Sequence, residues 1–100
     1  MPTIKVNFLS HLAKFIGTRV ASVNLDEPPT VAKLIEALQA KYGNKFTDHC
    51  MKDGGLAQEM VVLLINGLNL KQCAKDGQDP HDVQLKDTDD VTFIVQFGGG

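Results

Sequence analysis

The sequence lacks a strong excess of charge of either sign and is poor in cysteine. Its 100 residues include 10 basic and 12 acidic side chains, which give a formal net charge of −2 at pH 7. No global field therefore favours nucleic acid or an anionic membrane, and we expect neither as a partner. The two cysteines, Cys50 and Cys73, stand in polar sequence surroundings without CxxC spacing. This pattern predicts reduced thiols in a reducing compartment rather than a disulfide framework.

Long apolar runs are also missing. No segment approaches the roughly 20 apolar residues that a membrane-spanning helix needs. The opening Met1–Val6 alternates polar and apolar residues, whereas a signal peptide begins with a basic stretch followed by an apolar run. We therefore expect a cytoplasmic protein with no membrane association.

Recognisable catalytic and metal-binding motifs are absent as well. The sequence has no HExxH, P-loop or GxGxxG pattern, and its three histidines lack a companion at an informative spacing. A zinc site built from His49, Cys50, Cys73 and His81 would match no common ligand spacing. We expect no catalytic residue, no metal and no bound cofactor in this chain.

Enough apolar side chains are present for one hydrophobic core. Hydrophobic residues make up 43% of the chain, and chains of about this length bury roughly two-thirds of their unfolded surface around a single core. We predict one domain over residues 1–97, followed by a flexible glycine tail at 98–100.

Three segments alternate apolar and polar residues with the period of a β-strand. The first is 3–9, and 18–25 is its expected antiparallel partner. The last is 91–97, with Phe97 on the core face and Ile94 on the opposite face.

A fourth strand is predicted from composition rather than alternation. Residues 60–65 are continuously aliphatic, which is typical of a strand in the middle of a sheet. Asn66-Gly67 then favours a tight turn into a short strand at 68–70.

One long helix is predicted over 31–42, where apolar residues recur at helical spacing and Thr30 can cap the first turn. A short helical turn is expected at 10–16. Residues 44–59 show no convincing period, and 71–81 are polar and predict a surface loop. A lone amphipathic helix must cover one face of a mixed sheet to bury its apolar stripe. The order predicts an α+β fold of the β-grasp type, with a mixed four- to five-stranded sheet packed on one main helix.

The sequence resembles the MoaD/ThiS family of ubiquitin-like sulfur carriers. The resemblance depends mostly on residues 63–67 (LLING), residues 85–93 (LKDTDDVTF) and the terminal glycines. It implies that an E1-like enzyme of the MoeB/ThiF type uses ATP to adenylate Gly100, which then becomes a thiocarboxylate. The implied acceptor is the large subunit of molybdopterin synthase or another sulfur acceptor. Archaeal small modifiers and the eukaryotic ubiquitin-related modifier share this ending, so protein conjugation and tRNA thiolation are alternatives.

The chemistry of the tail is compatible with this role. Gly98, Gly99 and Gly100 have no Cβ to obstruct the terminal carbonyl and no restriction on φ. Three extended residues reach about 10 Å, which lets the carboxylate enter a partner's buried site. A simple flexible end remains the alternative explanation.

A partner must also recognise the domain, and apolar residues at positions expected to face solvent mark the candidate surface. Leu9 and Ile94 are such residues on the first and last strands. Leu68 joins them if the turn at Asn66-Gly67 brings it there, and Phe97 lies beside the tail. Scattered exposed aliphatic residues need no functional explanation, so that alternative stays open.

Overall fold

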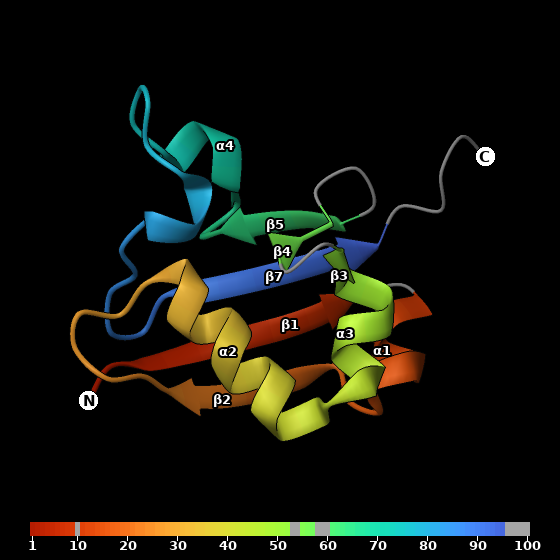
Figure 1. The fold of residues 1–100 in the computed structure, drawn as a ribbon. Coiled ribbons are helices and arrows are strands. Elements are labelled where there is room, and N and C mark those ends of the chain that lie inside the picture. Colours follow the sequence, from red (N-terminus) through yellow and green to blue (C-terminus); the bar gives the residue numbers. More distant parts are fainter. Residues whose placement is uncertain (10, 53–54, 58–60, 96–100) are drawn as a thin grey trace.

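The computed structural model describes residues 1–9, 11–52, 55–57 and 61–95. Its main feature is a five-stranded mixed sheet with the strand order β2-β1-β7-β5-β6. Helices α2 and α3 lie across one face of this sheet, and no helix of the described part covers the other face (Figure 1). This is the predicted mixed sheet packed on a main helix. Among the described residues, no helix is both long and apolar enough to cross a bilayer.

The N-terminal hairpin follows the predicted alternation. Strand β1 (Thr3–Leu9) pairs antiparallel with β2 (Val20–Asn24), with Val6 opposite Ala21. Helix α1 (His11–Ile16) connects them. Every second residue of β1 faces the core, because successive side chains of a strand point to opposite faces. Ile4, Val6 and Phe8 are accordingly 0% exposed.

Strand β7 (Asp90–Val95) lies at the centre of the sheet. It runs parallel to β1 and antiparallel to β5 (Val61–Ile65). The predicted turn follows β5: Asn66 and Gly67 have φ values of 51° and 86°, a left-handed pair typical of tight hairpins. The returning strand β6 (Leu68–Asn69) has only two residues.

Helix α2 (Val31–Tyr42) has the predicted bounds. The Thr30 hydroxyl accepts a hydrogen bond from the Lys33 amide at 3.3 Å, which satisfies one free donor of the first turn. The apolar stripe faces the sheet. Its buried members are Val31, Leu34, Ile35 and Leu38.

Regular structure is present in most of the described part of 44–59, where the sequence showed no convincing period. Helix α3 (Asn44–Cys50) follows α2 directly, and the chain then forms a small hairpin from β3 (Met51–Lys52) and β4 (Gly55–Leu56). Phe46 and Cys50 are four residues apart and therefore point to one side of α3, into the core.

The predicted surface loop at 71–81 also contains regular structure. Helix α4 (Leu70–Cys73) begins one residue before it, at the residue where the strand 68–70 was predicted to end. A 3-10 turn, η1 (Pro80–Asp82), overlaps its last residues. Asn69 starts α4 with a capping box, in which its side chain and that of Gln72 each bond the other's backbone amide.

Aromatic rings fill the centre of the core. Phe93 stacks on Phe8 with ring centroids 5.9 Å apart and meets Phe46 edge-on at 5.7 Å. Cys50 is 0% exposed within this core, so the expectation of polar surroundings is wrong for its thiol. Both cysteines are free, as predicted.

Candidate partner-binding face and C-terminal tail

The sheet face opposite α2 and α3 carries a row of apolar residues across three strands. The pairing registers place Ile94 of β7 between Leu9 of β1 and Val62 of β5. Directly opposed residues in neighbouring strands share a face, with Cβ atoms about 5 Å apart. Leu9, Ile94 and Val62 therefore form a contiguous set, here called the apolar row.

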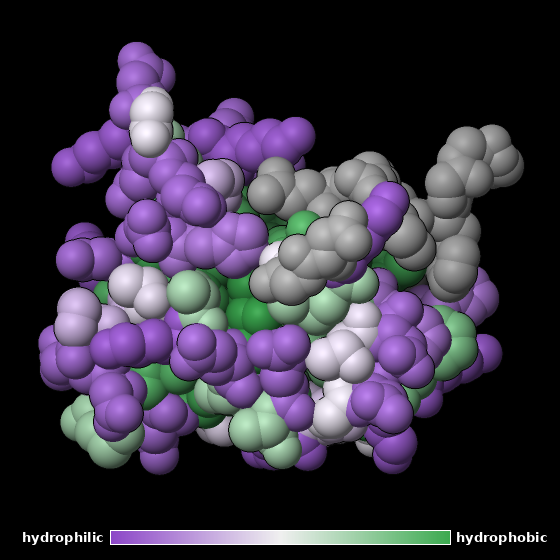
Figure 2. All heavy atoms as spheres, in the orientation of Figure 1, coloured by the Kyte–Doolittle hydropathy of each residue, from purple (hydrophilic) through white to green (hydrophobic). Residues whose placement is uncertain are grey.

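The apolar row is accessible to solvent although its strands supply the core. Leu9 is 45% exposed, and Ile94 and Val62 are half-buried. Their chain neighbours Phe8, Phe93 and Leu63 lie on the other face of the sheet, point toward the helices and are buried. The side seen in Figure 2, by contrast, is the helix side, and its surface is mostly hydrophilic.

One step back along β1 and β7, the same face carries polar residues on these two strands, flanked by Val20 of β2 and Leu64 of β5. Asn7 lies opposite Thr92 and donates to the Thr92 hydroxyl at 3.4 Å and to the Asp90 carboxylate. Lys5 lies opposite Asp90 in the next row. On β1 and β7 the face is therefore graded, with apolar side chains where these two strands end and hydrogen-bonded polar side chains where they begin.

The C-terminal tail follows β7 in the sequence, at the end of that strand where the open face is apolar. Because β1 and β7 are parallel, they end at the same edge of the sheet (Figure 1). Val95, the last described residue, is adjacent to Ile94 in the apolar row. Phe97, Gly98, Gly99 and Gly100 lie outside the described residues, so their proposed roles remain predictions.

Leu68 does not join the apolar row. It is 56% exposed, but the register of β6 places it opposite Ile65, whose side chain faces the core. The turn at Asn66-Gly67 therefore brings it to the other side of the sheet. Val62 takes the place that Leu68 was expected to fill. Sequence reasoning missed Val62 because it lies in a continuous aliphatic run, where alternation cannot separate the two faces.

Solved structures of other proteins share this architecture. The structure of small archaeal modifier protein 1 from Methanosarcina acetivorans matches with a TM-score of 0.75 and 24% identity, over 100% of this chain and 98% of that one. A protein from Pyrococcus furiosus described as molybdopterin converting factor, subunit 1, matches with a TM-score of 0.72 and 22% identity, over 95% and 98% of the two chains. A chain in the BexX/CysO complex of Amycolatopsis orientalis matches with a TM-score of 0.70 and 18% identity, over 97% and 99%.

This chain has the ubiquitin-like β-grasp fold. The resemblance to ubiquitin-like sulfur carriers of the MoaD/ThiS type is confirmed at the level of the fold. No protein-family model matches the sequence, and no curated protein matches it significantly.

His49 and His81 both contact nearby residues of the domain. The His49 ring stacks on Phe15 with centroids 3.8 Å apart and has Nδ1 3.0 Å from the Lys45 carbonyl. His81 holds the Asp79 carboxylate at 2.9 Å and accepts from the Leu56 amide through Nε2 at 3.3 Å. Hydrogen bonds from the His81 amide and ring lower the pKa of Asp79.

The buried Cys50 adds no reactive thiol to the open face. Burial raises the pKa of Cys50 to about 12, so its thiol stays protonated at neutral pH. Within the described ranges, no three His, Cys, Asp or Glu side chains gather as a metal site. Lys5 and Arg19 are exposed, where their charge is available to an acidic partner surface.

Proposed function

We propose that this chain is a sulfur carrier whose Gly100 carboxylate is activated and converted to a thiocarboxylate. The specific role proposed is the small subunit of molybdopterin synthase, acting in the cytoplasm. The observation that carries the proposal is the position of the glycine tail. It follows β7 at the edge where the apolar row reaches solvent, in a fold shared with a protein described as a molybdopterin converting factor subunit.

The proposed reaction needs a partner because a carboxylate is a poor acyl donor. A carboxylate oxygen of Gly100 attacks the α-phosphate of ATP held by an E1-like enzyme, and pyrophosphate leaves. A sulfide-level nucleophile then attacks the carbonyl carbon and AMP leaves, so one oxygen is replaced by sulfur. A Cβ at the last residue would crowd this attack, whereas glycine leaves both sides of the carbonyl open. The partner supplies the ATP site and the catalytic groups, and this chain supplies the acyl group.

The apolar row is the proposed docking surface for the activator and for the sulfur acceptor, such as the large subunit of molybdopterin synthase. Burying a leucine side chain contributes about 1.5–3 kcal/mol. A partner that covers Leu9 thus gains affinity beside the point where the tail departs. The tail can then extend into the partner's site while the domain stays outside.

Intact mass tests the chemistry. After incubation with an E1-like activator, ATP and sulfide, the protein should gain about 16 Da, the difference between sulfur and oxygen at an acyl carbon. A variant with Gly99→Val and Gly100→Val should gain nothing, because the branched side chains obstruct the terminal carbonyl. An unchanged mass with every activator of this class would refute the proposal.

Two exposed leucines provide a matched test of the docking surface. Leu9→Ser removes a member of the apolar row, and Leu68→Ser removes a leucine of similar exposure on the other face. We expect kcat/KM for activation to fall about tenfold in the first variant, as for loss of one buried leucine contact. The second variant should keep its activity. Equal effects would place the docking surface elsewhere.

Protein conjugation is the second candidate function, favoured by the match to small archaeal modifier protein 1 over the full length of this chain. Gly100 would then form isopeptide bonds with lysines of target proteins after the same adenylation. The last basic residue before the tail is Lys86. Trypsin should therefore leave a branch of residues 87–100 on modified lysines, which mass spectrometry detects in cell extracts. Transfer of sulfur to tRNA would use the same thiocarboxylate and leave no such branch.

A further inference from the structure

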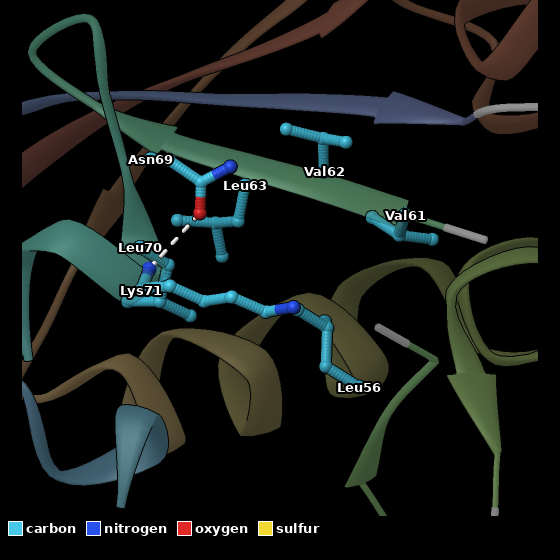
Figure 3. A pocket seen from close by; sticks show the side chains of 7 residues that line it. All are labelled: Leu56, Val61, Val62, Leu63, Asn69, Leu70 and Lys71. Carbon is cyan, nitrogen blue, oxygen red and sulfur yellow. Dashed lines mark hydrogen bonds between the residues drawn. The ribbon is translucent and has the colours of Figure 1, made fainter. Parts of the chain in front are cut away.

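A small recess lies beside β5, at the edge of the sheet that β6 leaves partly uncovered. Its volume is about 180 Å³. Figure 3 shows Leu63 and Val62 pointing to opposite sides of the strand beside it. The lining residues are Leu56, Val61, Val62, Leu63, Asn69, Leu70 and Lys71.

The recess exists because β6 is short. β6 pairs only with Leu64 and Ile65 of β5, and Leu70 already belongs to α4. The capping box at Asn69 turns the chain into that helix. Within the described chain, the Val61–Leu63 stretch has a strand neighbour only on its β7 side. The Val61 amide already donates to the Ala57 carbonyl at 2.8 Å, so the free part of the outer edge is at Leu63. An extended peptide is the kind of chain that lies along such an edge.

The lining combines aliphatic side chains, one positive charge and polar groups, and the polar groups supply more of its exposed surface than the apolar ones. Five of the seven residues are aliphatic, and Lys71 is the charged one. The backbone amide of Lys71 donates to the Asn69 carboxamide oxygen at 3.0 Å. The Lys71 ammonium group takes no part in that hydrogen bond. In Figure 3 the Lys71 side chain extends along the recess toward Leu56. No ion pair of Lys71 is recorded among the described residues, so its charge is available to an anionic group.

The volume decides what kind of ligand fits. Sites for drug-sized molecules and cofactors usually measure about 300–1,000 Å³. A cavity of about 150 Å³ with aliphatic walls accepts a molecule the size of benzene. The recess is thus too small for a nucleotide and has room for one side chain of about the size of leucine. Anchor side chains that fill such pockets carry much of the affinity of protein interfaces.

We infer that the recess binds an extended segment of a partner protein, with one aliphatic side chain inserted and an acidic side chain against Lys71. Val62 lines the recess and belongs to the apolar row, so the two surfaces are continuous around β5. A partner on the open face can therefore reach the recess with a neighbouring segment. The inference does not depend on the chemistry at Gly100.

Peptide titration followed by amide NMR of the full chain tests this inference. The probe is acetyl-Ser-Leu-Asp-Ser-amide. We expect shifts concentrated at Val61–Leu63, Leu70 and Lys71. The Asp-to-Asn peptide should bind roughly threefold more weakly, the size of one exposed ion pair. The Leu-to-Ser peptide should bind at least about tenfold more weakly, because it leaves the recess unfilled.

Lys71→Gln is the matching protein variant, and Lys75→Gln is its control on an exposed lysine outside the lining. The first should abolish the preference for the acidic peptide, and the second should keep it. Shifts outside the recess, equal binding of all peptides, or an unchanged preference in Lys71→Gln would overturn the inference. So would binding of free 4-methylpentanoate without binding of any peptide, since that result indicates a site for small acids.

Discussion

The two faces of the central strands are built from alternate residues of the same segments but obey different constraints. On the helix side, Phe8 and Phe93 are fully buried and touch each other across β1 and β7. On the open side, their chain neighbours Leu9 and Ile94 also lie opposite each other but remain accessible. The buried pair is held by packing. The accessible pair adds little to that packing, which makes it available for recognition.

The largest loss of stability is expected when the aromatic ring at the centre of the buried face is removed. Phe93→Ala deletes the contacts with both Phe8 and Phe46 and leaves a cavity in a core that cannot fully collapse. We expect the free energy of unfolding to fall by about 3–5 kcal/mol, measured by urea denaturation. Leu68→Ala, at an exposed side chain outside the core cluster, is the control and should cost about 1 kcal/mol or less. A loss at Phe93 no larger than that of the control would contradict the packing described above.

The protonation of the Cys50 thiol gives a second test of the buried face, through the pH dependence of stability. Burial raises its pKa to about 12, whereas the unfolded thiol titrates near 8.5–9. Above about pH 9 the unfolded chain releases a proton that the folded chain keeps, so stability falls as pH rises toward 12. The slope should approach 1.4 kcal/mol per pH unit.

The Cys50→Ala variant isolates this effect, because other groups titrate equally in both proteins. The difference in unfolding free energy between wild type and variant should shrink between pH 9 and 12. In the native protein at pH 8, a thiol reagent should label the partly exposed Cys73 and not Cys50. Rapid labelling of both thiols would show that the core around α3 opens readily.

The sequence predicts the buried face well because its patterns are long. Seven residues of alternation fix β1, and five apolar residues at helical spacing fix α2. Helix α3 escapes prediction because only Phe46 and Cys50 mark its buried side. Two positions do not define a period. Helix α4 is only four residues long, and its capping box at Asn69 is the one local signal.

The open face is less predictable because its arrangement depends on pairing between distant segments. Alternation identifies Leu9 and Ile94 singly, and the β-grasp topology makes the first and last strands expected neighbours. The parallel register of β1 and β7 then places these two residues directly opposite each other. Leu68 is misplaced for the same reason, since its face depends on the register across the turn. A sequence contains no direct record of which strands become neighbours.

The helix that covers the buried face offers a smaller and more local test. Thr30→Ala removes the hydroxyl that accepts from the Lys33 amide and leaves that donor without its side-chain partner. We expect a loss of about 1 kcal/mol in thermal or urea unfolding. Thr30→Ser keeps the oxygen and should recover most of the loss. If serine and alanine are equally destabilising, the cap contributes nothing and the methyl group matters instead.

The smallest change in unfolding free energy is expected for a substitution on the open face. This substitution tests the difference between the two faces most directly. Leu9→Ser shortens an accessible side chain that is outside the core cluster. Its unfolding free energy should stay within about 0.5 kcal/mol of wild type. Phe8→Ala, one residue earlier and fully buried, should lose several times more, about 3–5 kcal/mol. Adjacent residues of one strand would then differ because one side chain faces the helices and the other faces solvent. A loss of more than about 2 kcal/mol for Leu9→Ser would mean that the apolar row supports the fold itself, and its exposure would no longer argue for a partner.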